Sequence, residues 1–214
     1  MELDGKTIII DPYLSDSVEK IQPHNKRRVP VDESFLKVKP DIIILTHSHL
    51  DHTDPETLTH YLSEETSVTV LAPYNAWQIA RGLGGIKNNY VMFNRGTTWT
   101  EGNIEFTAVY AEHSDLYAIG VIIKAEGKSL YVTGDTLYNK TLLSDLEGEK
   151  IDYVFLPVNG LGNNMNMTDA KTFCEHIGAV AIPMHCGLFD SLNMNEFAYE
   201  KKIVPKFYKE INLI

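Results

Sequence analysis

Short runs of apolar, mostly β-branched residues recur along the chain and predict a series of strands. The run DIIIL, from Asp41 to Leu45, is typical, because it is continuous, aliphatic and short, like a strand buried on both faces. Turn residues bound most of these runs, which favours strands over helices. The same pattern predicts strands at Thr7–Ile10, Ser67–Leu71, Asn89–Phe93, Ile104–Tyr110, Ala118–Lys124, Ser129–Thr133, Asp152–Val158 and Ala179–Pro183.

Amphipathic segments between these runs predict helices. DPETLTHYL begins with Asp54 as the expected N-cap and Pro55 at the first helical position, and YNAWQIARGLGG ends in glycines. MTDAKTFCEHIG has Thr168 as its expected N-cap and Gly178 as its end. Its apolar positions recur at helical spacing and predict a core face of Ala170, Phe173, Cys174 and Ile177.

The order of these elements predicts an α/β fold with mixed sheets. From Tyr90 to Thr133 the predicted strands follow one another over short turns, which is typical of antiparallel pairing. Residues 15–39 are polar and irregular, and we expect a surface loop there with about one helical turn. A length of 214 residues suits a single domain spanning residues 1–214.

Composition and charge narrow the classes of partner. The net charge of −10 disfavours broad binding to nucleic acid or to anionic membranes, so a small molecule is the expected partner. Two cysteines form no disulfide framework, and no apolar stretch approaches the ~18 residues of a membrane span. The start of the chain shows no signal peptide, so we expect a cytoplasmic protein.

The stretch ILTHSHLDHTDPETL, from Ile44 to Leu58, concentrates histidine beyond what a structural role explains. His47, His49, Asp51 and His52 follow a predicted strand, and alternation along the chain places His47 and His49 on one side. Gathering these groups costs desolvation and repulsion unless something binds them. We therefore predict a metal site here, with Asp51 and His52 available to a second ion.

Three further potential ligands follow later strands. His113 comes after FTAVYAE, Asp135 after LYVTG and His185 after VAIPM. Taken singly, a histidine such as His113 is more often a hydrogen-bonded structural residue than a ligand, His185 could simply be buried, and Asp135 could belong to a turn. Together, imidazole and carboxylate suit zinc, manganese or iron rather than calcium.

The HSHLDH string resembles the signature of the metallo-β-lactamase fold superfamily. AEHSD, TGDT and PMHCGLF resemble its later motifs in order, and DGKTIIIDPYLSDS and LPVNGLGNNMN resemble the branch containing L-ascorbate-6-phosphate lactonase. The resemblance implies a four-layer αββα sandwich with mixed sheets. The first N-terminal strand of that family is expected to be missing, and the exposed edge this would leave favours a homo-oligomer.

The resemblance also implies a role for individual residues in a binuclear hydrolase. His47, His49 and His113 would bind one metal ion, Asp51, His52 and His185 the second, and Asp135 would bridge both. Asp51 would also be catalytic, orienting the metal-bridging hydroxide or accepting its proton. The two divalent ions would be zinc or, as in the lactonase, manganese, and iron also occurs in the superfamily.

Substrate contacts are expected from two polar segments. VNGLGNNMN offers the amides of Asn159, Asn163 and Asn164, which suit lactone oxygens but equally satisfy backbone groups in turns. NKRR offers Arg27 and Arg28, which could clamp a phosphate, although such a run is usually a solvated face. The expected substrate is a small ester or lactone, with a phosphorylated sugar lactone as one form of it.

Several alternatives remain open. The same metal pair would serve a phosphodiesterase, whereas a thioesterase is less favoured because no sizeable helical extension follows His185. A non-enzyme alternative is a metal-binding or regulatory protein that has lost turnover. A nucleophilic serine is not expected, since no GxSxG string occurs, and we interpret Cys186 as a packed neighbour of His185.

Overall fold

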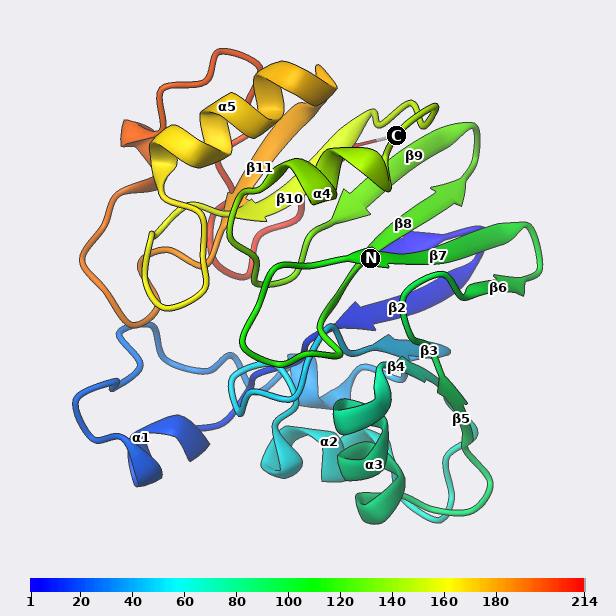
Figure 1. Ribbon diagram of the computed structural model, residues 1–214. Helices are drawn as coiled ribbons and strands as arrows, with labels where there is room; N and C mark the ends of the chain where they lie inside the picture. The colour runs from blue at the N-terminus through cyan, green and yellow to red at the C-terminus, as the bar shows by residue number, and fades with distance from the viewer. Residues whose placement is uncertain (214) are drawn as a thin grey trace. The chain divides into compact units, whose positions relative to one another are not determined.

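The computed structural model describes residues 1–213 and divides into two compact units, Met1–Asn94 and Arg95–Ile214. Each unit contains one mixed β-sheet with helices packed against it (Figure 1). The predicted α/β class with mixed sheets is therefore confirmed. The assignment of residues 1–214 to a single domain stays a prediction.

The first unit is built on a five-stranded sheet. Its outermost strand β1 is antiparallel to β2, and the remaining strands run parallel. Parallel strands buried on both faces explain the continuous aliphatic runs, and Ile42, Ile43 and Ile44 are all fully buried. The strand order is β1 (Glu2–Leu3), β2 (Lys6–Ile10), β3 (Ile42–Ile44), β4 (Thr69–Ala72) and β5 (Asn89–Met92).

The helices of this unit begin and end where their capping residues predict. Helix α2 (Pro55–Tyr61) has Asp54 as its N-cap, and α3 (Tyr74–Leu83) has Gly84 as its C-cap. The irregular stretch between β2 and β3 contains two short elements, α1 (Ser17–Ile21) and the 3₁₀ turn η1 (Phe35–Lys37), rather than one.

The second unit is built on a six-stranded sheet. Strands β6 to β9 pair antiparallel in succession, and β9, β10 and β11 run parallel. Helices α4 (Lys140–Ser144) and α5 (Met167–Ile177) and the 3₁₀ turn η2 (Met194–Glu196) complete it. The strand order is β11 (Val180–Met184), β10 (Tyr153–Pro157), β9 (Lys128–Val132), β8 (Ile119–Ala125), β7 (Ile104–Tyr110) and β6 (Thr98–Glu101).

Two predictions about these elements were wrong in detail. The N-cap of α5 is Asn166 and not Thr168, because the Asn166 side chain accepts hydrogen bonds from the amides of Thr168 and Asp169 at 2.8 and 3.0 Å. The antiparallel succession begins at β6 and not at Tyr90, because β5 pairs parallel with β4 in the other sheet.

The core face predicted for α5 is confirmed. Ala170, Phe173 and Cys174 are fully buried, and Ile177 packs against the same apolar cluster. Tyr131 of β9 lies in this cluster, with its ring centroid 6.3 Å from that of Phe173. None of the helices found within residues 1–213 has the length and apolar character needed to cross a membrane.

Candidate metal centre

In the first unit, two neighbouring parallel strands deliver polar residues to the same sheet edge. Asp11 follows β2 directly, and Thr46 and His47 come shortly after β3. The Asp11 amide donates to the carbonyl of Ile44 at 2.9 Å, which locks the two strand ends together. Because the carboxyl ends of parallel strands meet at one edge, residues from distant parts of the sequence gather there.

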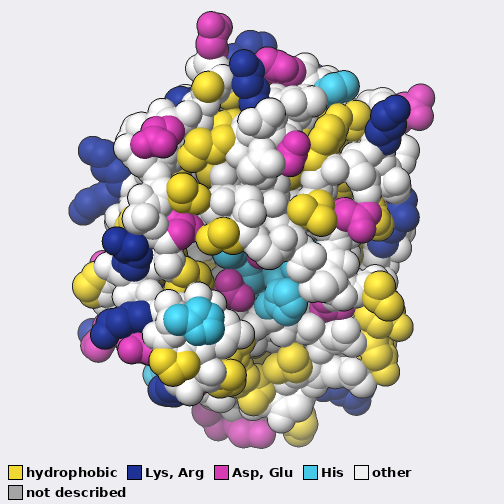
Figure 2. Space-filling model, turned by 60° about the vertical axis from the view of Figure 1, so that its left-hand side comes forward, with side chains coloured by type: hydrophobic (Ala, Val, Ile, Leu, Met, Phe, Trp, Pro, Cys, Tyr) yellow, Lys and Arg dark blue, Asp and Glu magenta, His cyan; other side chains and the backbone are white. Residues whose placement is uncertain are grey.

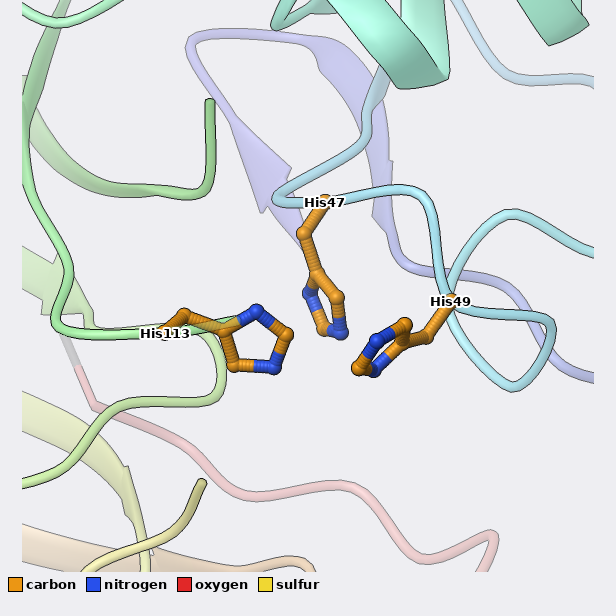
Figure 3. Close-up of side chains that lie close together, drawn as sticks. All are labelled: His47, His49 and His113. Atoms are coloured by element: carbon orange, nitrogen blue, oxygen red, sulfur yellow. The ribbon is translucent and has the colours of Figure 1, made fainter. Parts of the chain in front are cut away.

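Three imidazole rings cluster beyond this edge. The ring centroid of His47 lies 4.8 Å from that of His49 and 4.0 Å from that of His52. Figure 3 shows His47 and His49 with their rings facing each other from successive parts of the loop after β3. His47 is fully buried and His52 nearly so, whereas His49 is exposed. The prediction that His47 and His49 lie on one side is therefore confirmed.

The histidine loop is held in shape by its own backbone. The carbonyl of His49 accepts the amides of His52 and Thr53 at 3.0 and 2.8 Å, and the Thr53 hydroxyl donates to the carbonyl of His47 at 2.6 Å. The Asp54 carboxylate then caps α2. These contacts close a tight turn between β3 and α2 and fix the backbone from which the imidazoles project.

The donor set formed by the histidine loop and Asp11 fits a metal ion. One nitrogen each from His47 and His52 and one oxygen of Asp11 all lie within 4.8 Å of one another. The Nε2 atom of His52 is also 3.7 Å from an oxygen of Asp51. Packing imidazoles this closely in a buried place is unfavourable unless a cation or hydrogen bonds compensate them. Nitrogen and carboxylate oxygen donors suit zinc, iron or manganese.

The second unit repeats the same construction with parallel strands. Asp135 follows β9 after a short turn, Asn159 follows β10 and His185 follows β11. An oxygen of Asp135 lies 3.2 Å from Nε2 of His185. His185 adopts a left-handed backbone with φ of 54°, a conformation that few residues other than glycine adopt, although histidine tolerates it better than most.

The predicted asparagines surround these two ligand candidates. The amide of Asn164 donates to Asp135 at 3.1 Å, and the Asn159 amide lies 3.2 Å from Nδ1 of His185. Asn163 instead donates to the hydroxyl of Ser114 at 2.9 Å. Asn159 and Asn164 therefore hold candidate ligands in place, and their contact with substrate stays a prediction.

His113 and Cys186 have clearly different surroundings. The backbone amide of Asp115 donates to Nδ1 of His113 at 3.0 Å, which fixes the ring of this half-buried residue. Cys186 is only 3% exposed, and its burial raises the pKa of the thiol to about 11. A thiol protonated at neutral pH is a poor nucleophile, in keeping with the interpretation of Cys186 as a packed residue.

The two arginines proposed to hold a phosphate also differ from each other. The Arg27 side chain is 5% exposed, donates to the carbonyls of Tyr13 and Ser15, and stacks 4.4 Å from the centroid of the Tyr13 ring. It fastens its own loop, whereas Arg28 is exposed. On the face shown in Figure 2, the described lysine and arginine side chains are dispersed among acidic ones.

Sequence reasoning missed Asp11, which the structure places at the centre of the first unit's site. Its carboxylate contacts both Thr46 and His52, and its backbone is left-handed with φ of 46°. Asp11 stands within DGKTIIIDPYLSDS, but no role was assigned to it there, because an aspartate at a strand end does not reveal which distant groups it contacts. His60 and His176, by contrast, are exposed on α2 and α5.

Comparison with known proteins places this geometry in context. A family model described as the beta-lactamase superfamily domain matches residues 6–192. A UPF0173 metal-dependent hydrolase of Shouchella clausii is 31% identical, over 93% of this chain and 86% of its own length. A possible metal-dependent hydrolase from Veillonella parvula has a similar structure, with a TM-score of 0.76, 16% identity, and coverage of 96% of this chain and 92% of its own. The isothiocyanate hydrolase from Delia radicum gut bacteria also has a similar structure, with a TM-score of 0.74 and 18% identity. The match covers 96% of this chain and 92% of that protein's chain.

Proposed function

The chain belongs to the beta-lactamase superfamily of metal-dependent hydrolases, and on this premise we propose that it hydrolyses a small ester or lactone with two bound metal ions. The observation that carries the proposal is the packing of the His47, His49 and His52 rings at the ends of parallel strands. A structural role would separate these rings, whereas metal binding requires them together.

The proposed ligand assignment follows the order of the family motifs. His47, His49 and His113 would bind one ion, and Asp51, His52 and His185 the other, with Asp135 shared between them. Family membership supports this grouping. The short contact between Asp135 and His185 further supports their joint role.

Two bound divalent ions would lower the pKa of a water molecule and polarise the substrate oxygen. The chain's own contribution is then positioning and proton transfer. The Asp51 side chain is 22% exposed, so it is accessible to solvent, and one of its oxygens lies 3.7 Å from Nε2 of His52. We assign to Asp51 the uptake of the proton that the attacking water releases.

The substrate class rests on the surroundings of the polar segments. Arg27 is committed to its own loop, so only Arg28 of the proposed pair is accessible to a phosphate group. An uncharged ester or lactone therefore suits the site better than a phosphorylated substrate. The resemblance to the branch containing L-ascorbate-6-phosphate lactonase supports lactone chemistry, although that enzyme's own substrate carries a phosphate.

Metal content is the first test of this proposal. Elemental mass spectrometry of the purified protein should find two equivalents of zinc, manganese or iron, and Asp135→Asn should lower that content markedly. Asp4→Asn is the matched control, because Asp4 is an exposed turn residue with φ of 47°, a conformation that asparagine tolerates. Absence of metal in the wild type, even after reconstitution, would refute the proposal.

A substrate panel then separates the reaction classes. γ-Butyrolactone and p-nitrophenyl acetate represent lactones and esters, and bis-p-nitrophenyl phosphate represents phosphodiesters. We expect lactone or ester turnover that falls at least 100-fold in Asp51→Asn, because this variant removes both a proposed metal ligand and the proposed proton acceptor. Turnover of the phosphodiester alone would point to a phosphodiesterase, and a metal-loaded protein inactive on the whole panel would favour the regulatory alternative.

A further inference from the structure

A pocket with mainly apolar walls begins at the residue that follows His185, and none of the proposed metal ligands lines it. We propose that this pocket receives an apolar group on the acyl side of the substrate, such as an aliphatic chain or phenyl ring of about six carbons. This inference rests on the proposed function, because it names which esters or lactones the same site would select.

The pocket lies within the second unit, between the loop after β11 and residues 204–207. Asp190 holds this loop in shape, because its Oδ1 atom accepts the amides of Gly187 and Leu192, both at 2.9 Å. Gly187 has a left-handed backbone with φ of 83°, and a Cβ atom there would lie 3.8 Å from the ring of Phe207. The loop and residues 204–207 therefore face each other closely. The apolar lining consists of Cys186, Leu192, Met194, Val204, Pro205 and Phe207.

Two large apolar side chains of the lining remain open to solvent. Leu192 is 40% exposed and Phe207 is 43% exposed, whereas Cys186 is buried and Met194 packs against the main core of this unit. Exposed apolar side chains gathered around a hollow are typical of a ligand site, because a bound apolar group removes them from water. The pocket thus has a buried floor and a rim that a ligand would cover.

The polar residues of the lining have their own partners or reach water. Oδ1 of Asn193 accepts the amide and the side-chain nitrogen of Asn195 at 3.0 and 2.8 Å, and the carbonyl of Asn195 accepts from Lys202 at 3.3 Å. Lys206 is exposed, so its methylene stem can line the rim while the ammonium group stays in water. A sugar ring placed in this pocket would lose water from its hydroxyls without gaining equivalent partners, whereas an apolar group would not.

The size of the pocket suits one substituent rather than a whole substrate. Its volume is about 290 Å³. A cavity of about 150 Å³ is enough to hold benzene, and sites for complete drug-sized ligands begin at about 300 Å³. Consecutive Cα atoms are about 3.8 Å apart, so a group that contacts Cys186 lies one residue from His185. The ester carbonyl of the same molecule would then lie on the His185 side, with its apolar group in the pocket.

A series of p-nitrophenyl esters tests the proposal on the metal-loaded protein. From acetate through butyrate to hexanoate, kcat/KM should rise about 2- to 4-fold for each added methylene, with no further gain at decanoate. Leu192→Trp should flatten this rise, because the indole fills the pocket, and Phe207→Ala should move the optimum toward decanoate, because it removes a wall. Ile86→Trp is the matched control, since Ile86 is 92% exposed in the first unit, and it should keep the wild-type rise. A flat series in the wild type, or a rise that Leu192→Trp leaves intact, would overturn the inference.

Ligand binding to chelator-treated protein provides a readout that needs no turnover. In saturation-transfer NMR with 4-phenylbutyrate, the phenyl protons should receive the strongest transfer from the wild type and from Ile86→Trp, and none from Leu192→Trp. A urea unfolding curve of each variant checks that the fold is retained. Equal transfer from the wild type and Leu192→Trp would contradict the inference. Transfer that Leu192→Trp abolishes, together with no hydrolysis of any ester, would instead refute the proposed function and retain the pocket as a site for an apolar group.

A second copy of the chain is the rival occupant of the exposed rim. Light scattering coupled to size-exclusion chromatography measures the mass of the wild type and of Leu192→Trp. We expect the same mass for both proteins, because the rim is covered by substrate. A wild-type dimer that Leu192→Trp converts to a monomer would assign Leu192 and Phe207 to an interface and overturn the inference.

Discussion

At the scale of single residues, the Asp54 carboxylate joins the histidine loop to the helix that follows it. Asp54 is fully buried and accepts from the amides of Glu56 and Thr57 at 3.1 and 3.2 Å, and from the Thr57 hydroxyl at 2.5 Å. These bonds satisfy the first free amides of α2. The position of His52, two residues earlier, therefore depends on an N-cap.

Replacing the buried N-cap Asp54 should lower the free energy of unfolding more than replacing an exposed N-cap. We expect Asp54→Ala to lower the free energy of unfolding by about 2 kcal/mol, because it removes a cap and also leaves the buried Thr57 hydroxyl without its acceptor. Asn166→Ala, at the exposed cap of α5, should cost about 1 kcal/mol. Urea unfolding of both variants measures the difference, and equal losses would contradict the importance of burial at Asp54.

Asp11 and Asp54 also show where sequence reasoning succeeds at this scale. Asp54 was predictable because the cap and Pro55 form a local pattern. Asp11 was not, because its partners Thr46 and His52 lie 35 and 41 residues away along the chain. Contacts that depend on strand pairing leave no local trace in the sequence.

At the scale of elements, the antiparallel part of the six-stranded sheet contains a glycine that close packing requires. Gly120 of β8 lies against the ring of Tyr131 in β9, and a Cβ atom there would come within 2.7 Å of that ring and 3.2 Å of the Thr133 carbonyl. Tyr131 is fully buried in the main core of this unit, so it has little room to move. The contact thus couples the two strands.

A matched pair of glycine substitutions tests this coupling. Gly120→Ala should reduce the free energy of unfolding by about 1–3 kcal/mol, because overpacking displaces Tyr131 or the backbone. Gly82→Ala in α3 should instead raise it by about 0.4–1 kcal/mol, since the space there is open and alanine favours helix. Thermal and urea unfolding of the two variants should show a loss of stability for Gly120→Ala and a gain for Gly82→Ala. An unchanged free energy of unfolding in Gly120→Ala would contradict the tight packing.

The elements that the sequence did not predict share a physical cause. Strand β6 is only partly buried, and its TWTE pattern lacks a continuous apolar run. Strand β1 has two residues, and α4 has five, too few for a periodic pattern. The longer buried strands were found because burial on both faces requires aliphatic residues throughout.

At the scale of the whole molecule, both units use the same device to display polar groups. In each unit two parallel strands are followed, directly or after a short turn, by a residue with metal-binding chemistry: Asp11 and His47 in one unit, and Asp135 and His185 in the other. Residues just after a strand are accessible to ligands, and the strand before them holds their backbone in a fixed position. The ligand types were predictable from the sequence, whereas the asparagines that hold Asp135 and His185 in place needed the fold.

Removal of the metal should therefore affect the stability of the entire chain. At a free zinc concentration about 100 times the dissociation constant, binding should add about 2.7 kcal/mol to the free energy of unfolding, and a chelator should remove it. Imidazole has an ordinary pKa of about 6.5, and a protonated ring cannot bind metal. The difference in the free energy of unfolding between zinc-loaded and chelated protein should thus be fully present at about pH 8 and disappear as the pH falls toward 5. Thermal unfolding across this range measures it, and Asp135→Asn should show a smaller difference at every pH. A wild type whose unfolding is indifferent to chelation at pH 8 would show that no metal stabilises the fold.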